Sequence, residues 1–162
     1  LAAEMMAGVG IPLVHIAEIT ARAIRAAGLH RPGLMATAFT MEQSFYTDQL
    51  TAAGLAPLVP DAEDRGETHR IIYEELCRGI VTAESRQRFV EIANRLQARG
   101  ADCLILGCTE VGLLLDKSNV PVPVFDTTLL HCAGALDRAL GLGVEADAGL
   151  RETCAGTIDN PG

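Results

Sequence analysis

Hydrophobic positions along this chain switch repeatedly between short unbroken runs and a spacing of three or four residues. Unbroken runs are typical of buried strands, and the spaced positions are typical of helices with one apolar face. The runs that predict strands lie at residues 11–16, 33–37, 56–59, 101–107 and 122–125. Helical spacing covers residues 16–27, 41–50, 67–78, the interval between Thr82 and Gly100, 111–115 and 128–140. Strands that alternate with helices in this way predict an α/β fold with a parallel sheet.

Capping residues mark the ends of several predicted helices. A threonine hydroxyl accepts a hydrogen bond from a free amide of the first helical turn, so Thr40 and Thr82 are predicted N-caps. Glycine ends a helix without strain, and the predicted stops are Gly28, Gly54, Gly79 and Gly100. Proline in the run at 56–59 places that strand at an edge of the sheet.

The composition excludes several classes of partner. The 162 residues suit one domain or two small lobes, with 49% hydrophobic but only 4% aromatic residues for the core. The formal net charge of −8 argues against a nucleic-acid surface. No apolar stretch reaches the roughly 20 residues that a membrane span needs. Neither nucleic acid nor a membrane is therefore an expected partner.

The cysteines and the chain ends add to this picture. Five cysteines occur without CxxC spacing and without a histidine at zinc-ligand distance, which predicts reduced thiols in a cytoplasmic protein and no metal site. The periodic pattern ends near residue 142, so residues 143–162 are expected to form a flexible tail. Because the chain opens with Leu1 inside a helix-like run, we expect an amino-terminal piece to be missing.

Cys108 has the most informative position. It follows the apolar run at 101–107, so the thiol is expected at the carboxyl end of a buried strand, where open α/β sheets bind ligands. Gly107 permits close backbone approach, and Thr109 offers a hydroxyl and an amide at the turn. A helix starting here would lower the pKa of the thiol, whereas the carboxylate of Glu110 would raise it. Free cysteines also pack as small apolar residues, so catalysis and packing both stay open.

Hydroxyl groups follow two other predicted strands. Thr37 and Thr40 bracket the turn after residues 33–37, and with the free amides of the next helix they would make a seat for a carboxylate or phosphate. Ordinary capping and turn formation account for the same two residues. Asp126 and the threonines after it repeat the pattern, and there capping is the better explanation.

The four histidines differ in their expected roles. His15 ends the first predicted strand, and His30 and His69 are predicted to be solvated surface residues. His131 lies about one helical turn from Asp126, so it alone is suspected of orienting a site.

Three motifs in order resemble a known family. They occupy residues 33–42, 106–110 and 124–128, with Tyr46 and His131 beside them. Together they resemble the cofactor-independent aspartate/glutamate racemases, closest to the aspartate racemase branch. The resemblance runs from about residue 11 to residue 140. It implies two similar three-layer α/β lobes that face each other across a cleft, each contributing one cysteine.

The resemblance implies racemisation without pyridoxal phosphate or a metal. In that family one cysteine removes the α-proton, and the other returns a proton to the opposite face of the carbanion, because a single base would return its proton to the face it came from. Cys108 matches the second-lobe cysteine. The first-lobe cysteine would lie before Leu1, so this chain alone is expected to be inactive.

The resemblance also implies a set of substrate contacts. Thr37, Thr40 and the turn of Thr109 and Glu110 would hold the α-carboxylate or α-amino side of an acidic amino acid, and Arg78 would bind its distal carboxylate. Arg78 is equally explained as a cation at the carboxyl end of a helix. Glu110 stands where the glutamate racemase branch has histidine, which favours aspartate over glutamate.

The implied organisation has an incomplete first lobe. Residues 1–29 would be its remnant, residues 30–119 the second lobe, residues 120–142 a return to the first lobe, and residues 143–162 the tail. The complete protein is expected to be a cytoplasmic homodimer. Two other functions stay open: a hydantoin racemase or maleate isomerase-like relative acting on another acid, and a non-catalytic carboxylate-binding remnant in which Cys108 only packs.

Overall fold

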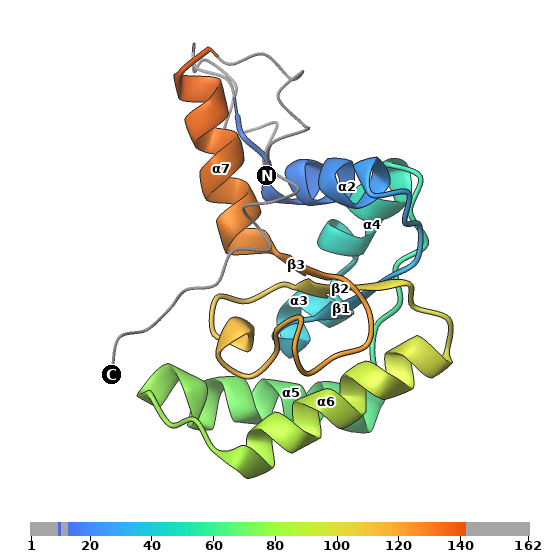
Figure 1. Cartoon of the computed structure of the whole chain (residues 1–162), viewed down its shortest axis with the longest axis vertical. Helices are drawn as coiled ribbons and strands as arrows, with labels where there is room; N and C mark the ends of the chain where they lie inside the picture. The colour runs from blue at the N-terminus through green and yellow to red at the C-terminus, as the bar shows by residue number, and fades with distance from the viewer. Residues whose placement is uncertain (1–9, 11–12, 142–162) are drawn as a thin grey trace.

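Three parallel strands form the centre of the molecule. The computed structural model describes residue 10 and residues 13–141. Strands β1 (Pro32–Met35), β2 (Cys103–Leu106) and β3 (Val124–Asp126) pair in the order β1-β2-β3 (Figure 1). On the open side of β1, a single parallel bridge joins Gly33 to Leu58. The predicted α/β fold with a parallel sheet is confirmed, and the proline-containing run at 56–59 lies at an edge, where it forms this isolated bridge in place of the predicted strand.

Helices cover both faces of this sheet. Figure 1 shows α2 and α4 on one side of the strands and α5 and α6 on the other, with α7 standing beside α2. The α-helices are α2 (Ile16–Ala26), α3 (Ala38–Glu42), α4 (Ser44–Ala52), α5 (Ala62–Glu74), α6 (Ala83–Ala98) and α7 (Thr127–Ala139), and the 3-10 helices are η1 (Leu76–Arg78) and η2 (Val111–Leu113).

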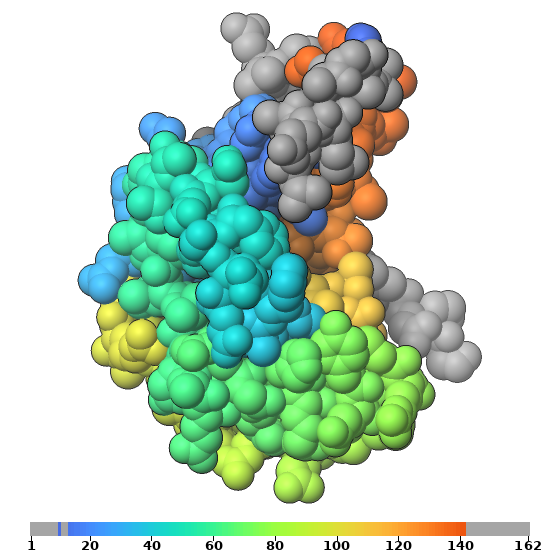
Figure 2. All heavy atoms as spheres, turned by 180° about the vertical axis from the view of Figure 1, so that it is seen from behind, coloured from blue at the N-terminus to red at the C-terminus, as the bar shows by residue number. Residues whose placement is uncertain are grey.

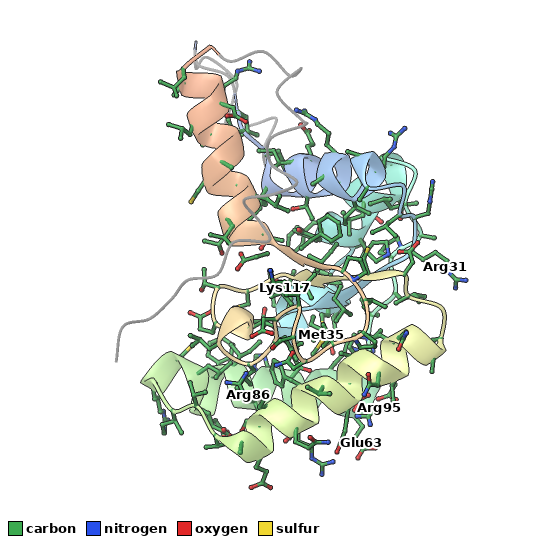
Figure 3. All side chains as sticks on the ribbon, viewed as in Figure 1. Arg31, Met35, Glu63, Arg86, Arg95 and Lys117 are labelled. Carbon is green, nitrogen blue, oxygen red and sulfur yellow. The ribbon has the colours of Figure 1, made fainter. Side chains whose placement is uncertain are left out.

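Alternate residues of the strands face opposite layers. Every residue of β1 and β2 is buried. Leu34 and Ile105 belong to the apolar cluster under α2 and α4. Met35, labelled in Figure 3, and Leu104 belong to the cluster under α5 and α6. A strand buried on both faces needs an unbroken apolar run, which explains why the sequence pattern predicts these two strands.

Most of the predicted helix ends are confirmed. Thr82 caps α6 by accepting a hydrogen bond from the amide of Ser85 at 3.0 Å. Gly79 and Gly100 follow helices in the left-handed region, at φ 74° and 95°. Asp126 caps α7 through hydrogen bonds to its carboxylate from the amides of Thr128 and Leu129, as the sequence favours.

Three predictions for residues 11–50 are wrong. Residues 13–15 form no strand; His15 instead caps α2, accepting from the amide of Ala17 at 3.2 Å, while residues 11–12 lie outside the described residues. Thr40 lies inside α3, whose N-cap position is Thr37. The helix expected over 41–50 is two helices, because the extended backbone of Gln43, with ψ 137°, interrupts it.

The division into lobes remains a prediction. Helix α2 packs on the described sheet through Ala17, Ala21 and Ile24, and it also contacts α7. Residues 1–9 and 143–162, which include the expected tail, lie outside the described residues. Within residues 13–141, no helix is both long and apolar enough to cross a membrane.

We predict that Gly107→Ala lowers the free energy of unfolding by about 1–3 kcal/mol. A Cβ atom at this position would lie 2.9 Å from Ala36 Cβ and 2.9 Å from Leu34 Cδ1, and both neighbours are fully buried. Urea unfolding followed by circular dichroism measures the change. Gly66→Ala is the matched control, because Gly66 is an exposed position of α5 where a Cβ meets nothing within 4 Å, and it should stabilise the protein by about 0.5–1 kcal/mol. Equal unfolding midpoints for the two variants would contradict this packing.

Candidate active site

The carboxyl ends of the three strands meet at one edge of the sheet. Met35 pairs with Leu106, and Leu106 pairs with Asp126, so the turn that follows each strand starts at the same level. Neighbouring strands lie about 4.8 Å apart. The amide of Gly107 also donates to the carbonyl of Met35 at 2.8 Å, which extends the pairing by one residue. The turns that carry Thr37 and Cys108 therefore lie side by side.

The Cys108 thiol is half-buried and bonded to a carboxylate. Its Sγ lies 2.8 Å from Glu110 Oε2, to which the S–H donates. The side chain packs against the apolar cluster under α5 and α6. Burial, and then the hydrogen bond to Glu110, raise the pKa of Cys108 to about 11. The thiol is therefore protonated at neutral pH.

We expected a following helix to lower the pKa of this thiol and the carboxylate of Glu110 to raise it, and in the structure the carboxylate has the larger effect. The segment after Cys108 forms η2, a three-residue 3-10 helix that starts at Val111, in place of the short α-helix expected over 111–115. So short a helix has little dipole to stabilise a thiolate. Glu110 has a pKa held below its usual range by hydrogen bonds from Cys108 and Thr109, so it is ionised at neutral pH.

A further contact holds the turn after Cys108 in place. Arg86 of α6, labelled in Figure 3, donates from Nη1 to the carbonyl of Leu114 at 2.8 Å and from Nη2 to that of Leu113 at 3.1 Å. These carbonyls end η2, so their position relative to α6 is set by a charged donor.

Thr37 and Thr40 bring two hydroxyls together beside this turn. Their Oγ1 atoms are 3.3 Å apart, and both residues are partly buried. Thr37 makes no side-chain capping bond to α3. Its hydroxyl is consequently not committed to the helix, and the pair can donate to an anion. Figure 2 shows the segment that contains α3, in cyan, at the surface of the molecule.

His69 contacts this turn, which the sequence did not reveal. It is half-buried, and its Nδ1 accepts from the amide of Ala38 at 3.3 Å. One turn earlier on α5, Arg65 pairs with Glu42 at 3.3 Å. The surface role expected for His69 is therefore wrong. The spacing of four residues places His69 and Arg65 on one face of α5, but nothing in the sequence shows that α3 packs there.

Arg78 lies on a segment that reaches the neighbourhood of Cys108. Leu76 belongs to the apolar cluster that Cys108 packs against, and the Cys77 thiol adds a smaller contribution to the raised pKa of Cys108. Arg78 itself is exposed at the end of η1. Within the described residues its guanidinium forms no ion pair, so it is available to a carboxylate.

His131 has a backbone partner in the segment before α2. Its Nε2 lies 2.9 Å from the carbonyl of Val14, so the ring joins α7 to the segment before α2. This contact accounts for the position of the ring, and the suspected role of His131 in orienting a site stays a prediction. Among the described residues, no three histidine, cysteine, aspartate or glutamate side chains are grouped so that they could hold a metal ion.

Chemically, the site offers a proton donor beside a carboxylate and a set of anion-binding groups. The donor is the thiol of Cys108, and the carboxylate is Glu110. The hydroxyls of Thr37 and Thr40 in the neighbouring turn suit a carboxylate, and the exposed guanidinium of Arg78, on the segment after α5, is a further group of this kind. This arrangement fits proton transfer on a small anionic molecule.

The chain matches a family of known proteins. A family model described as Asp/Glu/hydantoin racemase matches residues 1–135. An uncharacterised protein in the pnlA 3′ region of Pectobacterium carotovorum subsp. carotovorum is 31% identical over 105 residues, which are 65% of this chain and 69% of that protein.

Solved structures agree with this match. The structure of a candidate Asp/Glu racemase from Yersinia pestis is 44% identical with a TM-score of 0.83, over 86% of this chain and 61% of that one. An aspartate racemase homologue from Pyrococcus horikoshii is 32% identical with a TM-score of 0.79, over 85% and 61% of the two chains. Picrophilus torridus aspartate racemase shares the fold at 21% identity and a TM-score of 0.59, over 78% and 52%. This chain thus spans 61% of the length of the first two structures.

We predict that Glu110→Gln lowers the pKa of Cys108, because it removes the negative charge that opposes the thiolate. Burial remains, so the pKa should fall only part of the way to the usual value. Alkylation by iodoacetamide at pH 8 should become several-fold faster, at about tenfold for each pKa unit. Mass spectrometry of the Cys108 peptide measures the rate separately from the exposed Cys77 and Cys132.

The matched control is Glu91→Gln, which removes the same charge on α6. It should leave the alkylation rate of Cys108 unchanged. An unchanged rate in Glu110→Gln as well would show that the carboxylate does not govern this thiol.

Proposed function

The chain belongs to the Asp/Glu/hydantoin racemase family, as its motifs predict, and on that premise we propose that the complete protein interconverts L- and D-aspartate. Glutamate is the other candidate substrate. The observation that carries the proposal is the half-buried Cys108 thiol, hydrogen-bonded to Glu110 at 2.8 Å and adjacent to the turn of Thr37 and Thr40. The two solved relatives, a candidate Asp/Glu racemase and an aspartate racemase homologue, support it.

The proposed reaction uses a base on one face of the substrate and an acid on the other. The α C–H bond breaks, its electron pair stays on carbon, and the proton passes to a base supplied by a part of the protein outside this chain. The S–H of Cys108 then gives its proton to the opposite face of the carbanion and becomes a thiolate. In the reverse direction this thiolate removes the α-proton.

Glu110 favours the acid form of Cys108 in the resting protein. A carboxylate beside the sulfur opposes the thiolate, so the group starts the reaction with its proton in place. The same repulsion makes the thiolate, once formed, a stronger base than an ordinary one. That property helps because an α-proton of an amino acid is very weakly acidic.

In this proposal, different residues bind the two carboxylates of the substrate. Thr37, Thr40 and the turn of Thr109 and Glu110 receive the α-carboxylate and α-amino side, and the exposed guanidinium of Arg78 receives the distal carboxylate. Thiols alone carry the proton transfer, so no pyridoxal phosphate or metal takes part. We further propose that the complete protein works as a cytoplasmic homodimer, and that this chain alone is inactive because it holds only one of the two bases.

A non-catalytic role is the second candidate. The burial and raised pKa of Cys108 also suit a thiol that only packs, in a domain that binds carboxylates without transforming them. The two candidates differ in whether the α-proton of a bound amino acid exchanges with solvent.

We predict that the complete protein incorporates deuterium at Cα of aspartate in D₂O while it racemises it, and that Cys108→Ser slows racemisation at least about 100-fold. Chiral chromatography measures racemisation, and NMR measures the exchange. Because the other base is intact, the variant should retain exchange for one enantiomer only. Cys132→Ser, at an exposed cysteine of α7, should racemise normally. Binding of aspartate without exchange in the unaltered protein would favour the non-catalytic role.

We predict that Arg78→Ala raises KM for aspartate about tenfold or more, because a charge-assisted hydrogen bond to the distal carboxylate is lost. KM for an apolar analogue such as alanine should change little. Steady-state kinetics of both substrates measure the ratio. Arg88→Ala removes an exposed arginine of α6 and serves as the control. Equal effects of Arg78→Ala on the two substrates would remove this assignment.

A further inference from the structure

We infer that His69 is a positioning residue, which holds the turn of Thr37 and Thr40 in place through the backbone amide of Ala38. The inference concerns a contact between α5 and α3 that is present whatever the substrate is. Its consequence for catalysis rests on the proposed function.

Helix α3 has little apolar anchorage of its own. It contains five residues, and only Met41 among them is buried. At its end, the extended backbone of Gln43 separates it from α4, so it gains no support from a continuous helix. A helix of this length is not stable by its internal hydrogen bonds. Contacts from neighbouring elements must therefore hold it.

Polar side chains of α5 supply contacts at both ends of α3. At the start, His69 accepts the amide hydrogen of Ala38. At the other end, Arg65 forms its ion pair with Glu42, and Arg65 is itself held by a 2.8 Å bond to the carbonyl of Pro60. The glutamate side chain is 52% exposed, so this pair is screened by solvent and weak. The His69 contact, on a half-buried ring, is the stronger candidate for positioning.

The ring of His69 is oriented for this task. Its centroid lies 4.6 Å from that of Tyr73, one turn further along α5, and this packing limits rotation of the imidazole. Because Nδ1 accepts a hydrogen bond, the neutral ring must carry its proton on Nε2. A ring with a proton on Nδ1 would present a second donor to the Ala38 amide, and a flipped ring would present the Cδ2–H group, so either would break the contact.

The position of Ala38 decides where the site hydroxyls stand. Thr37 precedes it directly, and Thr40 follows two residues later, with the two hydroxyls 3.3 Å apart. Ala38 is the first residue of α3, so a shift of its amide would rotate the helix and move both hydroxyls relative to Cys108. His69 would thus affect how the substrate is held, while the acidity of the thiol is set elsewhere, by burial and Glu110.

The first test is spectroscopic and needs no activity. In the complete protein labelled with ¹⁵N-histidine, the resonances lost in His69→Asn identify His69. We expect its neutral form to be the Nε2–H tautomer with an unprotonated Nδ1. An Nδ1–H tautomer would overturn the inference even if the protein proves to be a racemase.

The second test compares three variants in the racemase assay. Asparagine places an acceptor oxygen close to the position of Nδ1, and alanine does not. His69→Ala should raise KM for aspartate about threefold to tenfold, the effect of one lost hydrogen bond, with a smaller change in kcat. His69→Asn should leave KM for aspartate close to that of the unaltered protein. His30→Ala, at an exposed histidine before β1 and thus at the opposite edge of the sheet, should behave normally.

Two outcomes of the kinetic test would overturn the inference. One is an equal loss in His69→Asn and His69→Ala, and the other is no loss in either. The alkylation rate of Cys108 should be the same in all variants, so a faster rate would show general loosening of the site and count against a positioning role. If the unaltered protein does not racemise aspartate, the proposed function fails, while the tautomer still decides the contact.

Discussion

The parallel pairing of β1 with β2 is the constraint on which the candidate site depends. It brings Thr37 and Cys108, which are 71 positions apart in the sequence, to neighbouring turns at one edge of the sheet. The amide of Gly107 continues the pairing to Met35, and a side chain at 107 would collide with Ala36 and Leu34. The close approach of the two turns therefore depends on the absence of a Cβ atom directly before the thiol.

The chemistry of the thiol follows from what surrounds it. An activated cysteine with a low pKa would need positive potential, such as a long helix beginning at the sulfur. This site has a three-residue 3-10 helix, a half-buried sulfur and an ionised carboxylate at hydrogen-bond distance. These features favour a thiol that donates a proton over one that attacks as a nucleophile, and proton donation to a carbanion is one half of a racemisation.

Some of this arrangement could be predicted from the sequence, because its causes are local. Thr82 caps a helix through an amide three residues away, and the apolar runs of β1 and β2 reflect burial on both faces. Other features depend on distant partners. The sequence suggests Thr40 as a helix cap, but the helix starts earlier in the chain. The hydrogen bond of His69 requires that α3 packs against α5, because its partner, the amide of Ala38, is 31 residues away in the sequence. Which helix face receives α3 cannot be derived from periodicity alone.

The two sides of the site are held by different forces. The turn of Cys108 is anchored by the sheet, by the Gly107 amide and by two bonds from Arg86 to the carbonyls that end η2. The turn of Thr37 and Thr40 belongs to a helix that buries one side chain and relies on polar contacts from α5, namely the His69 hydrogen bond, worth about 1 kcal/mol, and a weaker, solvent-screened ion pair from Arg65. Contacts of that size are comparable to those a bound carboxylate makes. Cys108 therefore stands on the sheet, while the hydroxyls of Thr37 and Thr40 stand on a more weakly held support, which a ligand of the proposed kind would be able to shift.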